Sequence, residues 1–377
     1  VLHAFVQEDN EKQKFDELNR EYIQKNLRVT RLFGIFTPSL MFTVGVAAMI
    51  SLWVGGKAVI TEEMSLGSFV AFNGYLLMLS WPMMGIGYVI NLTQKGQVAM
   101  GRIQEIFSSR PDISDNKNTS RSINELTGEI NFYGVSFTYP QTSQESLKDI
   151  QLKIPSGQIL AVVGEIGSGK STLIQMIPHL YNVMEGTLFI GGYPIDKIPL
   201  SVLRKNIGYV DQEPYLFSST IRENITFGVD SATDGEIDDV IKKSGLSADL
   251  NRFPEGLETV VGERGVSLSG GQIQRIALAR ALLVSPSILV LDDAFSSLDA
   301  ETEENILSNI KELTRGATTI IVSHRLSAVR KADRIIVMDQ GRIVEDGIHD
   351  ELMRLSGKYA QIHKNQALAM EMEITLQ

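Results

Sequence analysis

A glycine-rich segment that contains one lysine gives the first indication of chemistry in this 377-residue chain. Residues Gly164 to Thr172 read Gly-Glu-Ile-Gly-Ser-Gly-Lys-Ser-Thr, which fits the pattern G-x-x-x-x-G-K-[ST] of a phosphate-binding loop. The glycines let the backbone wrap closely around phosphate, so that successive N–H groups form an anion-binding nest. Lys170 would reach the β- and γ-phosphates, and the Ser171 hydroxyl would bind Mg²⁺. With an apolar run before it, at 159–163, and a helix expected after it, this loop predicts a site for a nucleoside triphosphate.

A pair of aspartates would complete this site. The apolar run Ile288-Leu-Val-Leu291 predicts a buried strand, and Asp292 and Asp293 follow it directly. In parallel α/β sheets, ligands bind at the carboxyl ends of the strands, where a phosphate-binding loop also lies. We therefore expect Asp292 to hold a water molecule of the magnesium ion. Without the loop at 164–172, a solvent-exposed acidic turn would be the simpler interpretation.

The segment between these two elements resembles a known signature. Leu268-Ser-Gly-Gly-Gln272 opens an expected helix and is similar to the signature motif of the ATP-binding-cassette (ABC) superfamily. Ser-Gly-Gly alone is common in loops, but its position between the two nucleotide motifs makes the match specific. The resemblance covers roughly 128–362 and implies an α/β P-loop ABC ATPase domain with a helical subdomain. It also implies that ATP and Mg²⁺ are bound and that the signature faces the ATP of a partner cassette.

Other positions match motifs of the same family in order. Tyr139 resembles the aromatic residue that stacks on adenine, and Gln212 resembles the loop glutamine that senses the γ-phosphate through Mg²⁺. Ser296 to Asp299 are similar to the segment that crosses to the partner, and His324 is similar to the switch histidine facing the γ-phosphate. Val261 to Gly265 resemble the exporter-specific loop that touches the coupling helices. The resemblance implies nucleotide-binding residues Tyr139, Gly164, Glu165, Gly167, Ser168, Gly169, Lys170, Ser171, Thr172 and Gln212, metal-binding residues Ser171, Gln212 and Asp292, catalytic residues Lys170, Gln212, Asp293 and His324, and signature residues Ser269, Gly270, Gly271 and Gln272.

One residue departs from the family's pattern. The position after the strand's first aspartate normally holds glutamate, the base that orients the attacking water, but here it is Asp293. Aspartate is one methylene shorter, which holds its carboxylate back by about 1.5 Å, and a displacement near 1 Å can cost on the order of 100-fold in rate. We therefore expect this chain's own site to bind ATP and to hydrolyse it slowly. Because the signature is intact, the chain resembles the degenerate-site half of bacterial heterodimeric multidrug exporters, whose partner carries the glutamate; a slow homodimer is the alternative.

These residues need a sheet to bring them together. Four short apolar runs alternate with helical stretches, at 159–163, 207–210, 288–291 and 319–322. This alternation predicts a mostly parallel sheet with helices on both faces. Residues 108–127 are polar and rich in turn formers, so we place a linker between two domains there. The tail, 363–377, carries no recognisable chemistry and is expected to be a short capping helix or unstructured.

The front third of the chain, 1–107, differs in character. Two long runs, 32–56 and 64–94, contain no Asp, Glu, Lys, Arg or His, and about 20 apolar residues suffice for a helix to span a bilayer. We predict spans at about 32–54 and 66–93 after a cytoplasmic helix, with two buried helices of a soluble protein as the alternative. Basic residues gather before the first run and after the second, which places both ends in the cytoplasm and the short loop outside. Six spans precede the cassette in the exporter layout, so we expect the last two here, in a chain truncated at its N-terminus.

Charge and composition exclude several other classes. The chain has 35 Lys+Arg against 45 Asp+Glu, a net charge of −10, which argues against a nucleic-acid binder. It has no cysteine, which excludes a disulfide framework and a Cys-based zinc site. A soluble ABC ATPase acting on DNA or ribosomes would lack the uncharged runs. An ABC importer normally keeps its cassette on a separate polypeptide.

The sequence therefore predicts one subunit of an ABC exporter, a multi-pass protein of the cytoplasmic membrane with its nucleotide-binding domain in the cytoplasm. We expect ATP hydrolysis to drive outward transport of an amphipathic small molecule, such as a drug, together with a second ABC half-transporter. A homodimeric lipid or peptide exporter is the alternative. Packing between helices is the more usual role of the side chains that could line a transport cavity, which are Asn73, Tyr75, Met78, Met83, Met84, Tyr88 and Asn91.

Overall fold

The computed structural model describes residues 2–109, 111–140, 142–262, 267–298, 300–308, 314, 316–323, 325 and 329–376. Within it the chain forms two compact units, Val1–Arg110 and Pro111–Gln377. Two predicted site residues, Asp299 and His324, lie outside the described residues, as does most of the predicted exporter-specific loop, 263–265.

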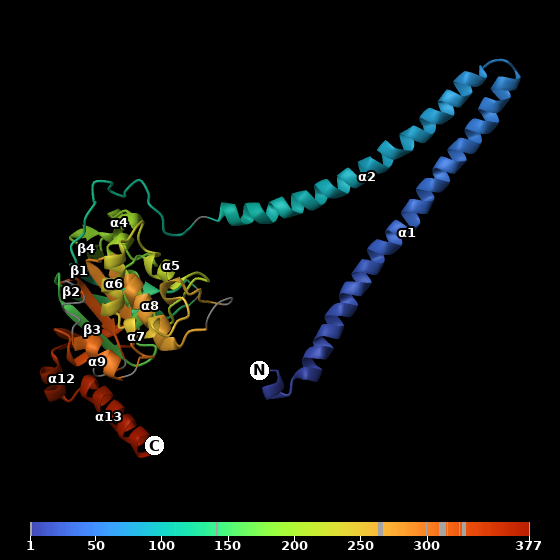
Figure 1. Ribbon diagram of the computed structural model, residues 1–377. Coiled ribbons are helices and arrows are strands. Elements are labelled where there is room, and N and C mark those ends of the chain that lie inside the picture. Colours follow the sequence, from blue (N-terminus) through green and yellow to red (C-terminus); the bar gives the residue numbers. More distant parts are fainter. Residues whose placement is uncertain are drawn as a thin grey trace. The chain divides into compact units, whose positions relative to one another are not determined.

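The first unit is a pair of long helices (Figure 1). Helix α1 (Glu8–Ile60) and helix α2 (Leu66–Ser108) are joined by a short turn. The Ser65 side chain caps the first turn of α2 by accepting a backbone hydrogen bond. Beside the turn the helices touch, because a Cβ atom added to Gly55 would come within 2.7 Å of the Phe69 ring. A glycine at this point therefore allows the close approach of the two helices.

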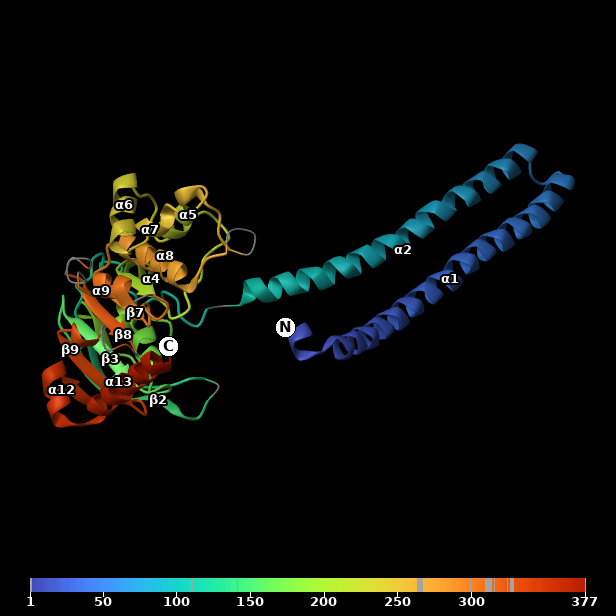
Figure 2. The same cartoon turned by 60° about the horizontal axis from the view of Figure 1, so that its bottom comes forward.

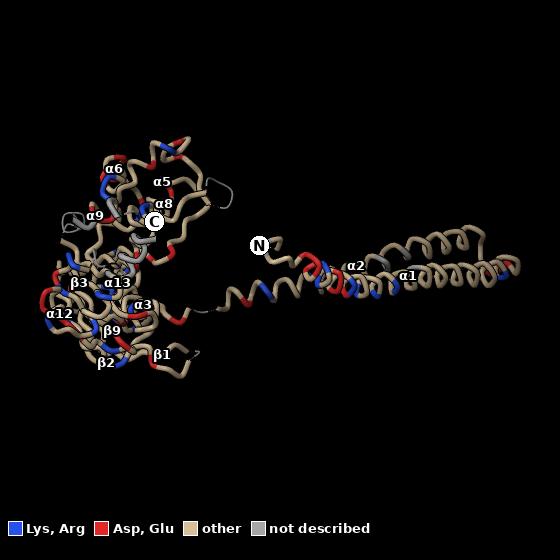
Figure 3. Tube along the Cα trace, turned by 90° about the horizontal axis from the view of Figure 1, so that it is seen from below, with Lys and Arg blue, Asp and Glu red and all other residues tan. Residues whose placement is uncertain are grey.

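Both predicted spans lie within these helices. Residues 32–54 fall inside α1, whose apolar part is long enough to cross a membrane and is almost wholly exposed. Residues 66–93 fall inside α2, where the stretch Leu66–Leu79 is apolar. Figure 3 shows charged residues at the start of α1, at the turn and at the end of α2, with uncharged stretches between them. The predicted cytoplasmic helix and the first span form one continuous helix, after a 3-10 turn at His3–Phe5.

A six-stranded sheet forms the centre of the second unit. Its strand order is β10-β9-β3-β8-β7-β6, and the neighbours are parallel except for β10 with β9. This confirms the predicted sheet. The four predicted strands, which are β3, β8, β7 and β6, are neighbours in it, so their carboxyl ends lie side by side. The strands are β3 (Ile159–Gly164), β6 (Ile207–Val210), β7 (Ile288–Asp292), β8 (Thr318–Val322), β9 (Arg334–Asp339) and β10 (Arg342–Gly347).

A second sheet, which the sequence did not predict, is antiparallel with the order β2-β1-β4-β5. Helix α3 (Lys170–Met176) packs between the sheets, because Leu173, Ile174 and Met176 are buried in one cluster with side chains of both. The helix after the phosphate-binding loop is therefore fixed on two sides. The strands are β1 (Ile130–Thr138), β2 (Glu145–Ile154), β4 (Leu188–Ile190) and β5 (Tyr193–Pro194).

A group of helices with its own hydrophobic core forms the predicted helical subdomain. Ile221, Ile241 and Ile276 belong to this core, which continues onto one face of the large sheet. Figure 2 shows these helices gathered at the end of the unit away from α12. They are α5 (Ile221–Thr226), α6 (Asp234–Lys243), α7 (Ser247–Leu250), the 3-10 turn η3 (Gly256–Glu258) and α8 (Gly270–Leu283). The remaining elements are η2 (Ile195–Lys197), α4 (Leu200–Lys205), α9 (Ala300–Ser308), α12 (His349–Leu355) and α13 (Lys358–Leu376).

The edges of the second unit differ from the predicted boundaries. Ile123 and Leu126, within the predicted linker, are buried in the core between the two sheets. Two apolar residues in a polar stretch give no periodicity, so the sequence did not reveal this packing. At the other end, α13 runs without interruption across the predicted division at 362/363. The tail is therefore the continuation of a helix that begins inside the domain.

Candidate functional site

The phosphate-binding loop lies between the end of β3 and the start of α3, as predicted. Gly169, which precedes α3, has a φ of 102°, and a Cβ atom there would come 2.7 Å from the Ser146 carbonyl oxygen. Gly167 has a φ of 81° with open space around it. Left-handed backbone at two positions of one loop explains why the motif uses glycine.

Lys170 extends back across this loop. Its ammonium donates hydrogen bonds to the carbonyl oxygens of Gly164, at 2.9 Å, and Glu165, at 2.8 Å. Burial lowers the pKa of Lys170, whereas the charges of Asp292 and Asp293 act in the opposite direction. The predicted lysine and the predicted aspartates are thus close enough to influence one another, and the lysine is already oriented along the loop that would surround the phosphates.

Two of the three residues predicted to bind the magnesium ion, Ser171 and Asp292, lie close together. The Ser171 hydroxyl donates a hydrogen bond to the Asp292 carboxylate, which is only 3% exposed at the end of β7. Burial raises the pKa of Asp292 to about 6; the Ser171 hydrogen bond opposes this, and Asp211 and Asp293 add to it. A carboxylate crowded by others in a buried position is stabilised by a cation.

A buried hydroxyl of the loop supports the fit to triphosphate. The Ser168 side chain is 4% exposed, and its Oγ has no hydrogen-bond partner among the described residues. Buried polar groups are rarely left unpaired, so such an atom calls for a missing partner. Together with Lys170 and the glycine backbone, this hydroxyl offers donors of the kind that phosphate oxygens accept.

The predicted adenine-stacking residue lies beside the same loop. The Tyr139 hydroxyl pairs with the Thr172 hydroxyl at 3.0 Å, which joins the end of β1 to α3. The ring makes edge contacts with Phe137 and Tyr181, with centroids 4.9 and 5.2 Å away. The structure therefore places Tyr139 next to the loop and holds the ring in a fixed orientation.

Asp293 occupies an unusual backbone conformation. Its φ is 47°, in the left-handed region that few residues other than glycine adopt. Its N–H donates to the Val322 carbonyl oxygen at 2.9 Å, which links it to the end of β8, just ahead of the position of His324. The backbone at position 293 is therefore held by the sheet.

The end of β6 brings further polar residues to this edge. Gln212 lies exposed just beyond β6, and the described contacts do not join its side chain to Ser171 or Asp292. The sequence did not point to its neighbour Asp211, whose charge acts on Asp292, or to Tyr209, whose hydroxyl is buried without a partner among the described residues. Burial raises the pKa of Tyr209, and Asp292 and Asp211 add to the effect. The strand-end argument used for the aspartate pair would have found Asp211.

The predicted signature begins α8. Ser269 and Gln272 form a reciprocal capping box at its first turn. Gly271 lies so close to Ser297 that a Cβ atom would come 2.9 Å from that residue's carbonyl oxygen. Asp249, which is buried, accepts hydrogen bonds from Gln272, at 3.2 Å, and from Arg275, at 2.8 Å. Among the described residues the signature makes these contacts with Asp249 in the helical part and with Ser297 after β7, and none with the phosphate-binding loop.

Comparison with known proteins accounts for both units. Residues 147–296 match the family model described as ABC transporter, and residues 1–83 match the model described as ABC transporter transmembrane region. The chain joins a helical ABC membrane region to an ABC ATPase domain. The ABC domain holds the loop, the aspartate pair and the signature in the predicted order.

Relatives of the whole chain carry the same two parts. The chain is 44% identical to the probable multidrug resistance ABC transporter ATP-binding/permease protein YheI of Bacillus subtilis, over 98% of this chain and 63% of that protein. It is 38% identical to the multidrug resistance-like ATP-binding protein MdlA of Escherichia coli, over 98% of this chain and 62% of that protein. It is 36% identical to the ATP-dependent lipid A-core flippase of Syntrophus aciditrophicus, over 97% of this chain and 60% of that protein. The structure of a bacterial Atm1-family ABC exporter with ATP bound superimposes with a TM-score of 0.86 at 31% identity, over 97% of this chain and 64% of that one. The chain thus spans a little under two thirds of the length of these relatives.

Proposed function

We propose that this chain is a subunit of an ABC exporter that hydrolyses ATP to move an amphipathic substrate outward across the cytoplasmic membrane. The observation that carries the proposal is that Lys170, Ser171 and Asp292 lie at the neighbouring ends of β3 and β7, close enough for Asp292 to act electrostatically on Lys170 and to interact with Ser171. This arrangement suits a triphosphate with its magnesium ion. The multidrug names of two relatives support outward transport of drugs.

Within the site, each residue has a part in phosphoryl transfer. Attack of water on the γ-phosphate needs positioning and charge neutralisation more than covalent chemistry. Lys170 and the loop N–H groups would hold the phosphates, and Ser171, Gln212 and Asp292 would hold Mg²⁺, which neutralises phosphate charge when bound. Asp293 would orient the water, and His324 would face the γ-phosphate.

The short side chain at position 293 makes this chain's own site the slow one. Its carboxylate ends about 1.5 Å short of the position that glutamate would reach, which fits binding of ATP with weak hydrolysis. The intact signature at Ser269–Gln272 would complete an active site on a different chain that carries the glutamate. A heterodimer is therefore the assembly we favour.

Transport would follow from closure of two cassettes around two ATP molecules. Each ATP would lie between one chain's phosphate-binding loop and the other's signature. Closure would push the coupling helices and switch the spans from inward-facing to outward-facing. Hydrolysis at the partner's site would reopen the pair. The cassettes would lie in the cytoplasm, and the turn at 61–65 would lie outside.

A homodimeric lipid or peptide exporter is the second candidate. The lipid A-core flippase among the relatives supports it, because 36% identity over nearly the whole chain does not separate a lipid from a drug as substrate. Stimulation of ATP turnover by added drugs or by added lipid would distinguish the two. An exporter of drugs responds to the first and a flippase to the second.

The proposed function is tested by ATP turnover of the complete subunit in nanodiscs. We compare the wild type alone with Asp293→Glu, and Lys170→Ala serves as the inactive control. If position 293 limits hydrolysis, the wild type alone is nearly silent, and the glutamate variant gains on the order of 10- to 100-fold. Brisk turnover by the wild type alone, unchanged in the variant, would refute the slow site and favour the homodimer.

A further inference from the structure

Two segments of the helical part that are far apart in the sequence are joined by a short antiparallel bridge. Residues 219–221 follow the loop that begins at Gln212, and residues 259–261 lead towards the signature. Thr220 and Val260 form the bridge. The Ile221 N–H donates to the Thr259 carbonyl oxygen at 3.1 Å, and the Val261 N–H donates to the Ser219 carbonyl oxygen at 2.9 Å.

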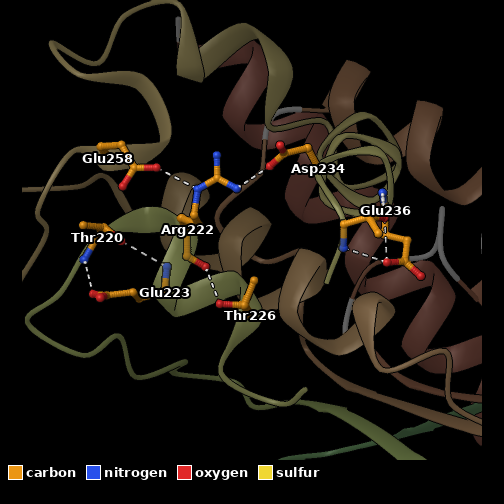
Figure 4. Close-up of polar contacts among 8 residues, drawn as sticks. Thr220, Arg222, Glu223, Thr226, Asp234, Glu236 and Glu258 are labelled. Carbon is orange, nitrogen blue, oxygen red and sulfur yellow. Dashed lines mark hydrogen bonds and ion pairs between the residues drawn. The ribbon is translucent and has the colours of Figure 1, made fainter. Parts of the chain in front are cut away.

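An arginine beside this bridge forms two ion pairs. In Figure 4, Arg222 at the start of α5 reaches two carboxylates on different elements. Its Nε lies 2.7 Å from a Glu258 carboxylate oxygen, at the end of η3, and its guanidinium lies 2.8 Å from Asp234, at the start of α6. Both carboxylates raise the pKa of Arg222. One side chain thereby joins α5, α6 and the segment before residue 259.

Two further local contacts fix the segments beside Arg222. Thr220 and Glu223 form a reciprocal capping box that fixes the first turn of α5 (Figure 4). At the far end of the bridge, Gly262 has a φ of 99°, and a Cβ atom there would come 2.7 Å from the Ser218 hydroxyl. Displacement of 219–221 would therefore carry 259–262 with it.

A half-buried arginine ties the body of the signature helix to the same region. Arg280, on α8, donates to the carbonyl oxygens of Tyr215, at 3.0 Å, and Asn224, at 2.8 Å. Arg280 lies far along α8 from its first turn and joins the Gln212 segment to the signature helix. Arg222 joins the start of α5 to α6 and to the segment before residue 259.

We propose that Arg222, with Glu258 and Asp234, is a positioning residue that couples the two ATP sites of the transporter. This rests on the proposed function, in which Gln212 responds to this chain's own ATP and Ser269–Gln272 complete the partner's site. When ATP binding moves the Gln212 segment, the clamped bridge moves residues 259–262 with it, and α5 moves α8, whose hydrophobic core it shares, so that the signature at the start of α8 follows. The slow site then governs the active one without hydrolysing its own ATP.

An exposed ion pair is suited to a test of this kind. Such pairs contribute little to folding stability, so their removal leaves a folded protein in which coupling can be measured. Arg334 provides a matched control, because it forms a similar exposed pair with Asp346 between β9 and β10, outside the helical part. Each alanine variant removes one exposed guanidinium that is paired with carboxylate.

The experiment measures ATP turnover of the complete transporter as it purifies from its membrane, in nanodiscs. We expect Arg222→Ala to lower kcat about fivefold, near the lower end of typical coupling between sites, with the KM for ATP unchanged because the phosphate-binding loop is intact. Arg222→Lys restores part of the rate, since an ammonium can keep one of the two pairs. Glu258→Gln lowers kcat alone but adds nothing in the Arg222→Ala background, as expected for residues that act together.

The results that would overturn the coupling are distinct from those that would overturn the function. Equal kcat in Arg222→Ala and Arg334→Ala would refute the proposed coupling. A loss of turnover in Arg222→Ala that Arg222→Lys does not relieve, and that is accompanied by a lower unfolding temperature, would refute it as well. In both cases the wild type remains an active ATPase, and the proposed function stands. A wild-type transporter that neither binds nor hydrolyses ATP refutes the proposed function and the coupling with it.

Discussion

At the scale of single residues, Asp293 joins a short carboxylate to a backbone that favours it. Aspartate and asparagine are several-fold enriched in the left-handed region, where longer side chains are rare. With a φ of 47°, position 293 therefore suits aspartate locally, although glutamate would reach further towards the γ-phosphate. The proposed slow hydrolysis and the favoured backbone conformation would both follow from the same side chain.

The short side chain and the left-handed backbone at position 293 together predict opposite changes in turnover rate and in folding stability for a longer side chain. Asp293→Glu should raise turnover, and the strained backbone should cost roughly 1 kcal/mol, which lowers the unfolding temperature of a domain of this size by about 2–4 °C. Asp293→Asn is the matched control, because it keeps the left-handed preference and loses the charge. It should keep the unfolding temperature and gain no turnover. A glutamate variant that is as stable as the wild type would contradict the backbone argument.

Removal of the Ser168 hydroxyl should weaken nucleotide binding without changing the stability of the protein in the absence of nucleotide. Its Oγ has no partner among the described residues, so Ser168→Ala should leave the unfolding temperature without nucleotide unchanged. If the hydroxyl binds phosphate, the variant should bind ATP about fivefold more weakly, as expected for one hydrogen bond of about 1 kcal/mol. Titration with a fluorescent ATP analogue measures this. Equal affinity in both proteins would show that the hydroxyl plays no part in binding.

At the scale of elements, the C-terminal helix α13 is held by a histidine–tyrosine contact. Tyr359 is buried, and its hydroxyl pairs with His349 Nδ1 at 2.7 Å. Burial raises the pKa of Tyr359 to about 12, so the hydroxyl keeps its proton and can donate to a neutral imidazole. Partial burial lowers the pKa of His349, Arg330 and His363 add to this, and Asp350 opposes it. The folded environment of His349 therefore favours the neutral imidazole.

The anchoring of α13 should weaken in acid. Because the pKa of His349 is lowered in the fold, the unfolded state binds more protons over the range just below 6.5. The stabilisation is complete above that value and is lost as the pH falls through the folded pKa. Hydrogen exchange in α13, corrected for intrinsic rates, should be faster near about pH 5.5 than at about pH 7.5. In His349→Gln the difference should disappear; if it persists there, another group is responsible.

The local elements of the site could be predicted from the sequence, and the long-range contacts could not. Strand, loop and helix around Lys170 are consecutive, so their pattern is visible in one short window. The antiparallel sheet depends on alternating strands with irregular register, such as the shifts in the β1–β2 pair, which give a weak signal. The pairs Arg275–Asp249 and Arg222–Glu258 join residues far apart in sequence. Only the fold brings such charges together.

At the scale of the whole molecule, the absence of cysteine makes the predicted topology directly testable. A single cysteine at Glu63, in the turn between α1 and α2, should react with a membrane-impermeant maleimide added to intact cells. A cysteine at Ser109, after α2, should react only once the membrane is opened, because the positive-inside rule places it in the cytoplasm. The cysteine-free wild type gives the background. The reverse labelling pattern would invert the orientation.

The length of α1 has a mechanical consequence. A helix of 53 residues is about 80 Å long, whereas the hydrocarbon core of a bilayer is about 30 Å thick. Much of the rod must therefore extend beyond the hydrocarbon, and Pro38, which removes a backbone hydrogen bond, is the point at which it can flex. In the proposed orientation, the membrane would hold the helix as a pivot holds a lever. The stiffness of the helix would then set how much of a movement at its cytoplasmic end reaches the outer leaflet.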